Sequence, residues 1–296
     1  MTLIIWPYAF GGDQVHYRMV YEKLGSLDLI EGYSFYNQAL SAYELGHFIL
    51  SWLFARVLEQ NIFIACANLF LGYFAMQLFK KWGVSLFIAA PIVLTNFYFL
   101  VLYFSAERLK FGVLFFLISM LCFDRLRCFY SAIFFAIISH FQMLIIYSGQ
   151  LFCYLAQKLA YFFQTLLLSK RLLLLMVFFF LLGFLTLDAL LIKFDAYLEF
   201  RGVSNLFRIT IFLALALFYS KKRTETVLVF IPLIVAVILV GGERVNMFGY
   251  FAFLYYALPV NRGVNVGVLV TSTYYTYWSV FFLKNIIEYG DGFYVG

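Results

Sequence analysis

Long apolar runs follow one another along almost the whole chain, and only short polar stretches separate them. Of the 296 residues, 65% are hydrophobic and 12% are charged, whereas about a quarter of a soluble domain is charged. A soluble fold of this size cannot bury so much apolar surface, so lipid is the expected solvent. Spanning segments must satisfy their own backbone groups, and these runs are too long for barrel strands. The sequence therefore predicts an all-α, polytopic integral membrane protein with a single membrane domain over 1–296.

The apolar runs predict about 10 or 11 transmembrane helices, since about 20 residues span a bilayer. The predicted spans are 44–58, 61–79, 84–104, 107–123, 129–147, 149–168, 171–191, 205–220, 226–240, 246–260 and 265–284. The first of them is short enough to be re-entrant or tilted. Met1–Phe10 is apolar but too short to span alone, and it lacks the basic start and the cleavage site of a signal peptide.

Basic residues cluster in alternate loops, which is the cytoplasmic bias of membrane proteins. The clusters are Lys80–Lys81, Arg125 with Arg127, Lys170–Arg171, Lys221–Lys222–Arg223 and Arg262. We therefore interpret the net charge of +6 as a topology signal and expect no nucleic-acid partner. The opposite face then carries a polar external surface segment at 11–43 and an external loop at 193–208. The four cysteines show no metal-ligand spacing, and we expect small buried side chains there.

Two ionisable residues at predicted membrane depth are candidates for function, because burying a charge in lipid is costly. Arg108 opens a long apolar run directly after Glu107, and its alternatives are an ion pair with Glu107 or an interfacial side chain reaching the headgroups. His140 lies in the middle of an apolar run, beside Ser139 and Gln142. It is either a satisfied core residue or a neutral imidazole that acts as a base.

Two further candidates follow pairs of glycines, which permit tight turns. Arg244 follows Glu243 at the start of a helix that carries Tyr250. It either lines a cavity together with Tyr250 or is an interfacial arginine at a capped helix start. Asp13 is either a helix N-cap or a functional carboxylate, and Tyr17 lies one turn later on the same face.

Arg208 begins an apolar run after the external loop, so it adds a third arginine to the same side of the membrane. Arginine forks match the geometry of phosphate oxygens. Three arginines, one carboxylate and one histidine on the outer side therefore suit a lipid-linked phosphate or diphosphate.

Four segments, in chain order, resemble the EpsG/Wzy group of bacterial polysaccharide polymerases, which includes the O-antigen polymerases. They are Gly-Gly-Asp13-Gln-Val-His-Tyr17, Ala42-Tyr-Glu44-Leu-Gly-His-Phe-Ile, Glu107-Arg108-Leu-Lys-Phe-Gly with the later Ala136-Ile-Ile-Ser-His140, and Glu243-Arg244-Val-Asn-Met-Phe-Gly-Tyr250. The chain departs from the family's pattern in its nearly absent first helix and in Leu109, where the family has Gln.

The resemblance implies a GT-C-like helical bundle with a periplasmic-side cavity, in the bacterial inner membrane. It implies transfer of a growing glycan from undecaprenyl diphosphate to the non-reducing end of a lipid-linked repeat unit. Metal and cofactor are not expected, and a chain-length regulator protein is a possible partner. His140 or Asp13 would be the base. The diphosphate and sugars would be bound by Arg108, Arg244, Arg208, Tyr17, Tyr250 and Glu243.

Other functions share these features. A lipid-linked oligosaccharide flippase or transporter would also need arginines in a polar cavity, but its charged groups should lie near the midplane in two related halves. A membrane acyltransferase acting on surface polysaccharide would use His140 as its catalytic residue. In an assembly subunit the polar residues would only join helices.

Overall fold

The computed structural model describes residues 1–165, 173, 177 and 203–294. Every element of regular structure in this part of the chain is a helix, which confirms the all-α prediction. The chain divides into two compact units, Met1–Met143 with Leu258–Gly296, and Leu144–Ala257. Each unit is described by itself below.

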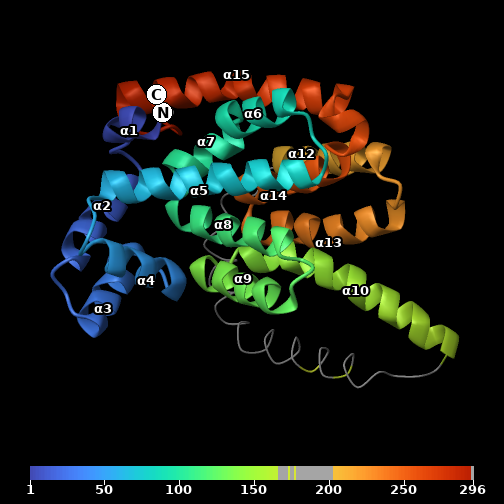
Figure 1. The fold of residues 1–296 in the computed structure, drawn as a ribbon, viewed down its shortest axis with the longest axis horizontal. Helices are drawn as coiled ribbons and strands as arrows, with labels where there is room; N and C mark the ends of the chain where they lie inside the picture. Colours follow the sequence, from blue (N-terminus) through green and yellow to red (C-terminus); the bar gives the residue numbers. More distant parts are fainter. Residues whose placement is uncertain (166–172, 174–176, 178–202, 295–296) are drawn as a thin grey trace. The chain divides into compact units, whose positions relative to one another are not determined.

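The first unit holds the longest series of helices. They are α1 (Thr2–Ile5), η1 (Trp6–Tyr8), α2 (Asp13–Leu24), α3 (Leu29–Leu40), α4 (Leu45–Phe54), α5 (Gln60–Lys81), α6 (Leu86–Thr95), α7 (Phe97–Phe104), α8 (Glu107–Leu121), α9 (Leu126–Ser139), η3 (Val260–Gly263) and α15 (Val266–Tyr289). In Figure 1, α8 lies between α5 and α9, α15 runs along α6 and α7, and α2, α3 and α4 form a lobe at one end. The two termini lie close together, and Gly11 donates its amide proton to the Gly290 carbonyl at 2.8 Å.

The second unit contains α10 (Met143–Thr165), α12 (Val203–Tyr219), α13 (Arg223–Val240) and α14 (Glu243–Ala257). Helix α12 packs on both α13 and α14. Most of the predicted span 171–191 and most of the predicted external loop 193–208 lie outside the described residues. The prediction of a loop was wrong for residues 203–208, because these residues form the start of α12.

Local chemistry sets the ends of the helices in the first unit. Helix α5 ends in a Schellman motif, in which Gly83 adopts a φ of 76°. The Val84 amide donates to the Phe79 carbonyl at 3.0 Å, and the Gly83 amide to that of Lys80 at 2.9 Å. Asn96 separates α6 from α7, and its side chain caps α7 by accepting from the Tyr98 amide at 3.1 Å. The predicted span 84–104 is therefore a pair of helices bent by 47°.

A second break lies at His140, where a continuous span over 129–147 was predicted. Helix α9 ends at Ser139, and His140 has an extended backbone with φ −160° and ψ 119°. Helix α10 begins at Met143. His140 therefore lies at a break between two helices and not in the middle of one.

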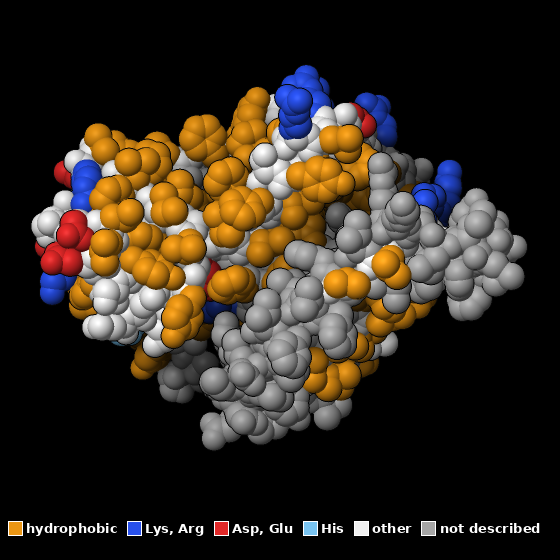
Figure 2. Space-filling view, turned by 90° about the horizontal axis from the view of Figure 1, so that it is seen from below, with side chains coloured by type: hydrophobic (Ala, Val, Ile, Leu, Met, Phe, Trp, Pro, Cys, Tyr) orange, Lys and Arg blue, Asp and Glu red, His pale blue; other side chains and the backbone are white. Residues whose placement is uncertain are grey.

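Length and composition qualify few described helices as membrane spans. Helix α5 alone is long and apolar enough, and the bent pair α6–α7 also qualifies if it counts as one span. Shorter apolar helices cover Leu45–Phe54, Leu126–Ser139 and Asn205–Tyr219. Hydrophobic side chains are nevertheless exposed over much of the described part of the face in Figure 2, and most of the charged side chains on it gather in a few places at its margins. The predicted number of spans stays a prediction.

The cysteines differ from the prediction of four small buried side chains. Cys122 and Cys128 form a disulfide across the turn between α8 and α9. Cys66 is exposed, and only Cys153 is both free and buried.

Candidate functional site

The first turns of α4 and α8 meet inside the first unit, and an ion pair joins them. Glu44 is the N-cap residue of α4 and Arg108 is the second residue of α8. Arg108 donates from Nη1 to Glu44 Oε2 at 3.0 Å. The Glu44 side chain is 4% exposed and that of Arg108 is 18% exposed. The carboxylate is thus held inside the protein, while part of the Arg108 side chain reaches the surface.

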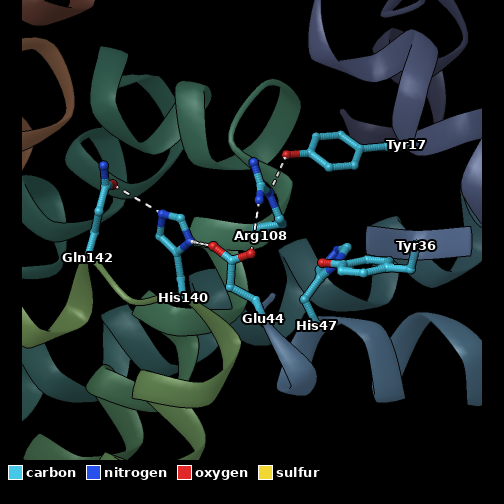
Figure 3. A network of polar contacts seen from close by, with 7 residues as sticks. All are labelled: Tyr17, Tyr36, Glu44, His47, Arg108, His140 and Gln142. Carbon is cyan, nitrogen blue, oxygen red and sulfur yellow. Dashed lines mark hydrogen bonds and ion pairs between the residues drawn. The ribbon is translucent and has the colours of Figure 1, made fainter. Parts of the chain in front are cut away.

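His140 contacts the other oxygen of the same carboxylate. Its Nδ1 lies 3.1 Å from Glu44 Oε1, and its Nε2 lies 3.1 Å from Gln142 Oε1. Figure 3 shows Glu44 between the imidazole and the guanidinium, so one carboxylate holds two functional side chains.

Two glycines allow His140 to come this close. A Cβ on Gly46 of α4 would lie 2.8 Å from the backbone nitrogen of Ser139. A Cβ on Gly112 of α8 would lie 3.2 Å from His140 Cβ and 2.8 Å from Met143 Cγ. The end of α9 therefore fits into a notch between α4 and α8 that only small residues leave open.

Tyr17 completes the arrangement from α2. Its hydroxyl oxygen accepts a hydrogen bond from Arg108 Nε at 2.9 Å, and the side chain is 5% exposed. Burial raises the pKa of Tyr17 to about 12, although the charge of Arg108 opposes the rise. The hydroxyl therefore keeps its proton at neutral pH and can donate it to another oxygen.

A second acid–histidine pair lies beside the first. His47 Nε2 is 3.4 Å from Glu107 Oε1, and both side chains are 2% exposed. The Tyr36 hydroxyl lies 2.9 Å from His47 Nδ1, and Ser51 Oγ lies 3.5 Å from Nε2. Of the alternatives for Arg108, the ion pair forms with Glu44 and not with Glu107, whose Oε1 pairs with His47.

The arrangement of Glu44 and His140 is that of a carboxylate orienting an imidazole. A neutral His140 that donates from Nδ1 to Glu44 has a bare Nε2, which accepts from the Gln142 amide group when that amide turns its nitrogen inward. A protonated His140 donates from both nitrogens, to Glu44 and to the Gln142 oxygen. Gln142 can satisfy either state by rotating its amide, so the site can hold or release one proton at Nε2.

Asp13, the other predicted base, lies one helical turn before Tyr17. It is the first residue of α2, after Gly12, and its side chain is exposed. Its negative charge acts on Tyr17 one turn later. Asp13 therefore lies near the site's tyrosine, and the contacts of Glu44 favour His140 over Asp13 as the base.

The remaining predicted residues belong to the second unit. Arg208 is exposed on α12, and Arg244 is the second residue of α14 and half-buried. Tyr250 is fully buried, with its ring 5.7 Å from Phe212 and 6.1 Å from Phe253. Glu243 begins α14.

Sequence reasoning missed Glu44 and His47 as site residues. Their i,i+3 spacing was a usable signal. It places two polar side chains on the same face of one helical turn, in an otherwise apolar segment. Glu107 and Arg108 gave the matching signal on α8. Within the described residues, no cluster of three His, Cys, Asp or Glu side chains could hold a metal ion.

No protein-family model, curated protein or solved structure matches this chain. The family resemblance therefore stays a prediction, and the geometry of Glu44, Arg108 and His140 is the basis for function.

Proposed function

We propose that this chain is a membrane glycosyltransferase that polymerises a surface polysaccharide from undecaprenyl-diphosphate-linked repeat units. The observation that carries the proposal is the buried Glu44 carboxylate, which contacts His140 Nδ1 and Arg108 Nη1 at 3.1 and 3.0 Å. Glu44 thereby holds a base, His140, and a cation, Arg108, in one preorganised site. Transfer of a sugar from a diphosphate needs both.

His140 has the properties of a general base. Glu44 fixes its Nδ1–H tautomer and stabilises the imidazolium that forms, as the carboxylate does in a catalytic triad. Nε2 removes the proton from the acceptor hydroxyl as its oxygen bonds to the anomeric carbon. The bond from that carbon to the diphosphate oxygen breaks, and the diphosphate leaves with the electron pair.

Arg108 is suited to the leaving group. Glu44 and Tyr17 use two of its N–H groups, and the side chain is 18% exposed. The other N–H groups can bind phosphate oxygens, and the Tyr17 proton can serve as a further donor. Within the second unit, Arg244, Arg208, Glu243 and Tyr250 stay proposed contacts for diphosphate and sugar, and the proposed reaction uses no metal or cofactor.

The proposed protein is a multi-pass helical bundle of the bacterial inner membrane, with about 10 or 11 spans and its site at the periplasmic face. The hydrophobic composition and the exposed apolar side chains support this setting. A chain-length regulator is a candidate partner.

Buried Lys110 favours a second candidate, a flippase for the lipid-linked unit. It is fully buried, its Nζ donates to the Tyr103 carbonyl at 3.1 Å, and no described carboxylate forms an ion pair with it. Ionisable groups within a membrane often mark transport paths. An acyltransferase could use the Glu44–His140 pair, but would have no evident use for Arg108 at the site.

The test starts from cells that lack the gene. A missing polymerase leaves a single repeat unit on the lipid anchor, whereas a missing flippase leaves none. The lipid-linked unit that accumulates is then extracted and given to the purified protein in liposomes, and the products are resolved on a gel. A ladder with wild type and none with His140→Ala supports the proposal. A ladder with neither protein refutes it.

A further inference from the structure

The buried pair His47–Glu107 has no role in the reaction proposed above, although it occupies the same two helical turns as Glu44–Arg108. Helix α4 contributes Glu44 and His47, three residues apart, and α8 contributes the adjacent residues Glu107 and Arg108. The two ion pairs therefore join the same two turns (Figure 3 shows three of the four residues, with Tyr36 next to His47).

The acid of this second pair is incompletely satisfied. Glu107 is 2% exposed, and its Oε2 has no hydrogen-bond partner among the described residues. Its Oε1 pairs with His47 alone among the described residues. A buried carboxylate with one free oxygen attracts any cation within reach.

His47 is held more firmly than the acid it contacts. Tyr36 lies against Nδ1 at 2.9 Å, and the ring is packed among Tyr17, Tyr36 and Phe111 with centroids 5.6 to 5.9 Å away. The imidazole is thus fixed in place on the α4 side, and it fixes the position of the Glu107 carboxylate.

We propose that His47 is a positioning residue that keeps Glu107 from competing with Glu44 for Arg108. Without the imidazole, Glu107 would be a buried anion that has lost its ion-pair partner. The adjacent Arg108 on the same helix is then available to it, as is Lys110, whose charge already interacts with that of Glu107. Arg108 drawn toward Glu107 would leave Glu44, and Glu44 would then lose the geometry that orients His140. This inference rests on the proposed function, because it assigns His47 a part in maintaining the proposed base and cation.

The chain's histidine content permits a test that does not depend on enzyme activity. It has three histidines, His16, His47 and His140. In protein labelled with ¹⁵N-histidine, the ring-nitrogen signals of His140 report which nitrogen carries the proton, and single substitutions assign the signals. His16 is exposed on α2 and is the internal reference.

His47→Leu should shift the His140 signals from a fixed Nδ1–H tautomer to a mixture of tautomers. It should lower kcat for glycan transfer about 10- to 100-fold, as loss of a residue behind a functional side chain does, with KM changed less than about 2-fold because binding groups remain. His47→Gln, which keeps a donor for Glu107, should restore most of both properties. It also covers the case in which the leucine variant fails to fold.

The decisive variant is the pair His47→Leu with Glu107→Gln, which removes the competing charge as well. We expect it to recover the His140 signals and to bring kcat back to within about 3-fold of Glu107→Gln alone. Phe48→Leu is the matched control, since Phe48 is buried on α4 and packs on Tyr36 without contacting the polar pair. It should lower the melting temperature without moving the His140 signals.

Two results would overturn the inference: unchanged His140 signals in His47→Leu, or signals that stay shifted when Glu107→Gln is added. If wild type forms no ladder, the proposed function fails by itself, and the histidine signals still decide whether His47 holds Glu107 away from Arg108.

Discussion

The two units of the chain use their polar side chains in different ways. In the first unit, Glu44, Arg108 and His140 are mostly buried and are paired across 64 and 96 residues of sequence. In the second, an ion pair among the described residues joins Lys222 to Glu225 within one helical turn, and the lysine is 75% exposed. Distant pairing in the first unit means that folding itself assembles the site.

This difference suggests a division of labour between the units. Groups that must act in the transition state benefit from fixed geometry, because reorganising them during the reaction would add to the barrier. Groups that bind a large, variable lipid-linked glycan benefit from exposure. Arg208 is exposed and Arg244 half-buried, which suits binding. We therefore expect the chemical step to depend on residues of the first unit and binding on residues of the second.

Glu44→Gln should have the largest effect. It removes the charge that both Arg108 and His140 contact, so we expect the transfer rate to fall about 10³-fold or more, within the range for loss of general-base function. Breaking a buried ion pair costs about 3–5 kcal/mol of unfolding free energy, so the melting temperature should also fall. Both are measured on purified protein. Glu59→Gln, on an exposed acid at the start of α5, should change neither. A fully active Glu44→Gln would remove Glu44 from the mechanism.

Arg108→Lys compared with Arg208→Lys tests the division directly. A lysine at 108 cannot reach Glu44 and Tyr17 with separate fixed N–H groups, as the guanidinium does. We expect kcat to fall about 100-fold for a misplaced cation. At the exposed position 208, lysine keeps the charge, so kcat should hold and KM should rise by a few-fold at most. Equal effects on kcat at both positions would contradict the division.

Sequence reasoning reached the helical class and several members of the site, because both depend on local signals. Long apolar runs indicate helices whatever the tertiary structure is. Arg108, His140 and Tyr17 are conspicuous in the sequence because they are polar residues among apolar neighbours. The role of Glu44 could not be predicted from its neighbours in the sequence, because its two partners are 64 and 96 residues away.

The break at His140 was missed for the same reason. Residues 129–147 read as one apolar helix, and the contacts that favour ending it at Ser139 come from Gly46 and Gly112 on other helices. The partner of Glu107 depends likewise on the packing of α4 against α8. At both places, tertiary contacts and not the local sequence pattern determine the structure.

Gly46→Ala compared with Gly112→Ala tests that notch. A Cβ at 46 would meet the Ser139 backbone nitrogen at 2.8 Å, whereas at 112 it would meet the flexible Met143 side chain at the same distance. Overpacking costs about 1–3 kcal/mol, and backbone cannot yield as a methionine can. We expect Gly46→Ala to lower activity about 10-fold or more by moving His140, with the smaller loss for Gly112→Ala. The reverse order, by transfer assay and melting temperature, would show that α4 does not position His140.

Tyr17→Phe should have the smallest effect, and Tyr21→Phe on the same helix is its control. Both residues are buried, but the Tyr17 oxygen accepts from Arg108 at 2.9 Å, whereas Tyr21 donates to the Leu58 carbonyl at 3.1 Å. Each variant loses one hydrogen bond, worth about 0.5–1.5 kcal/mol or somewhat more to a charged group, so their melting temperatures should fall alike. Only Tyr17→Phe leaves Arg108 Nε without its acceptor and removes the spare donor, so its transfer rate alone should fall, by about 5- to 10-fold for roughly 1–1.4 kcal/mol. Equal transfer rates in the two variants would make Tyr17 a packing residue and confine the reaction to Glu44, Arg108 and His140.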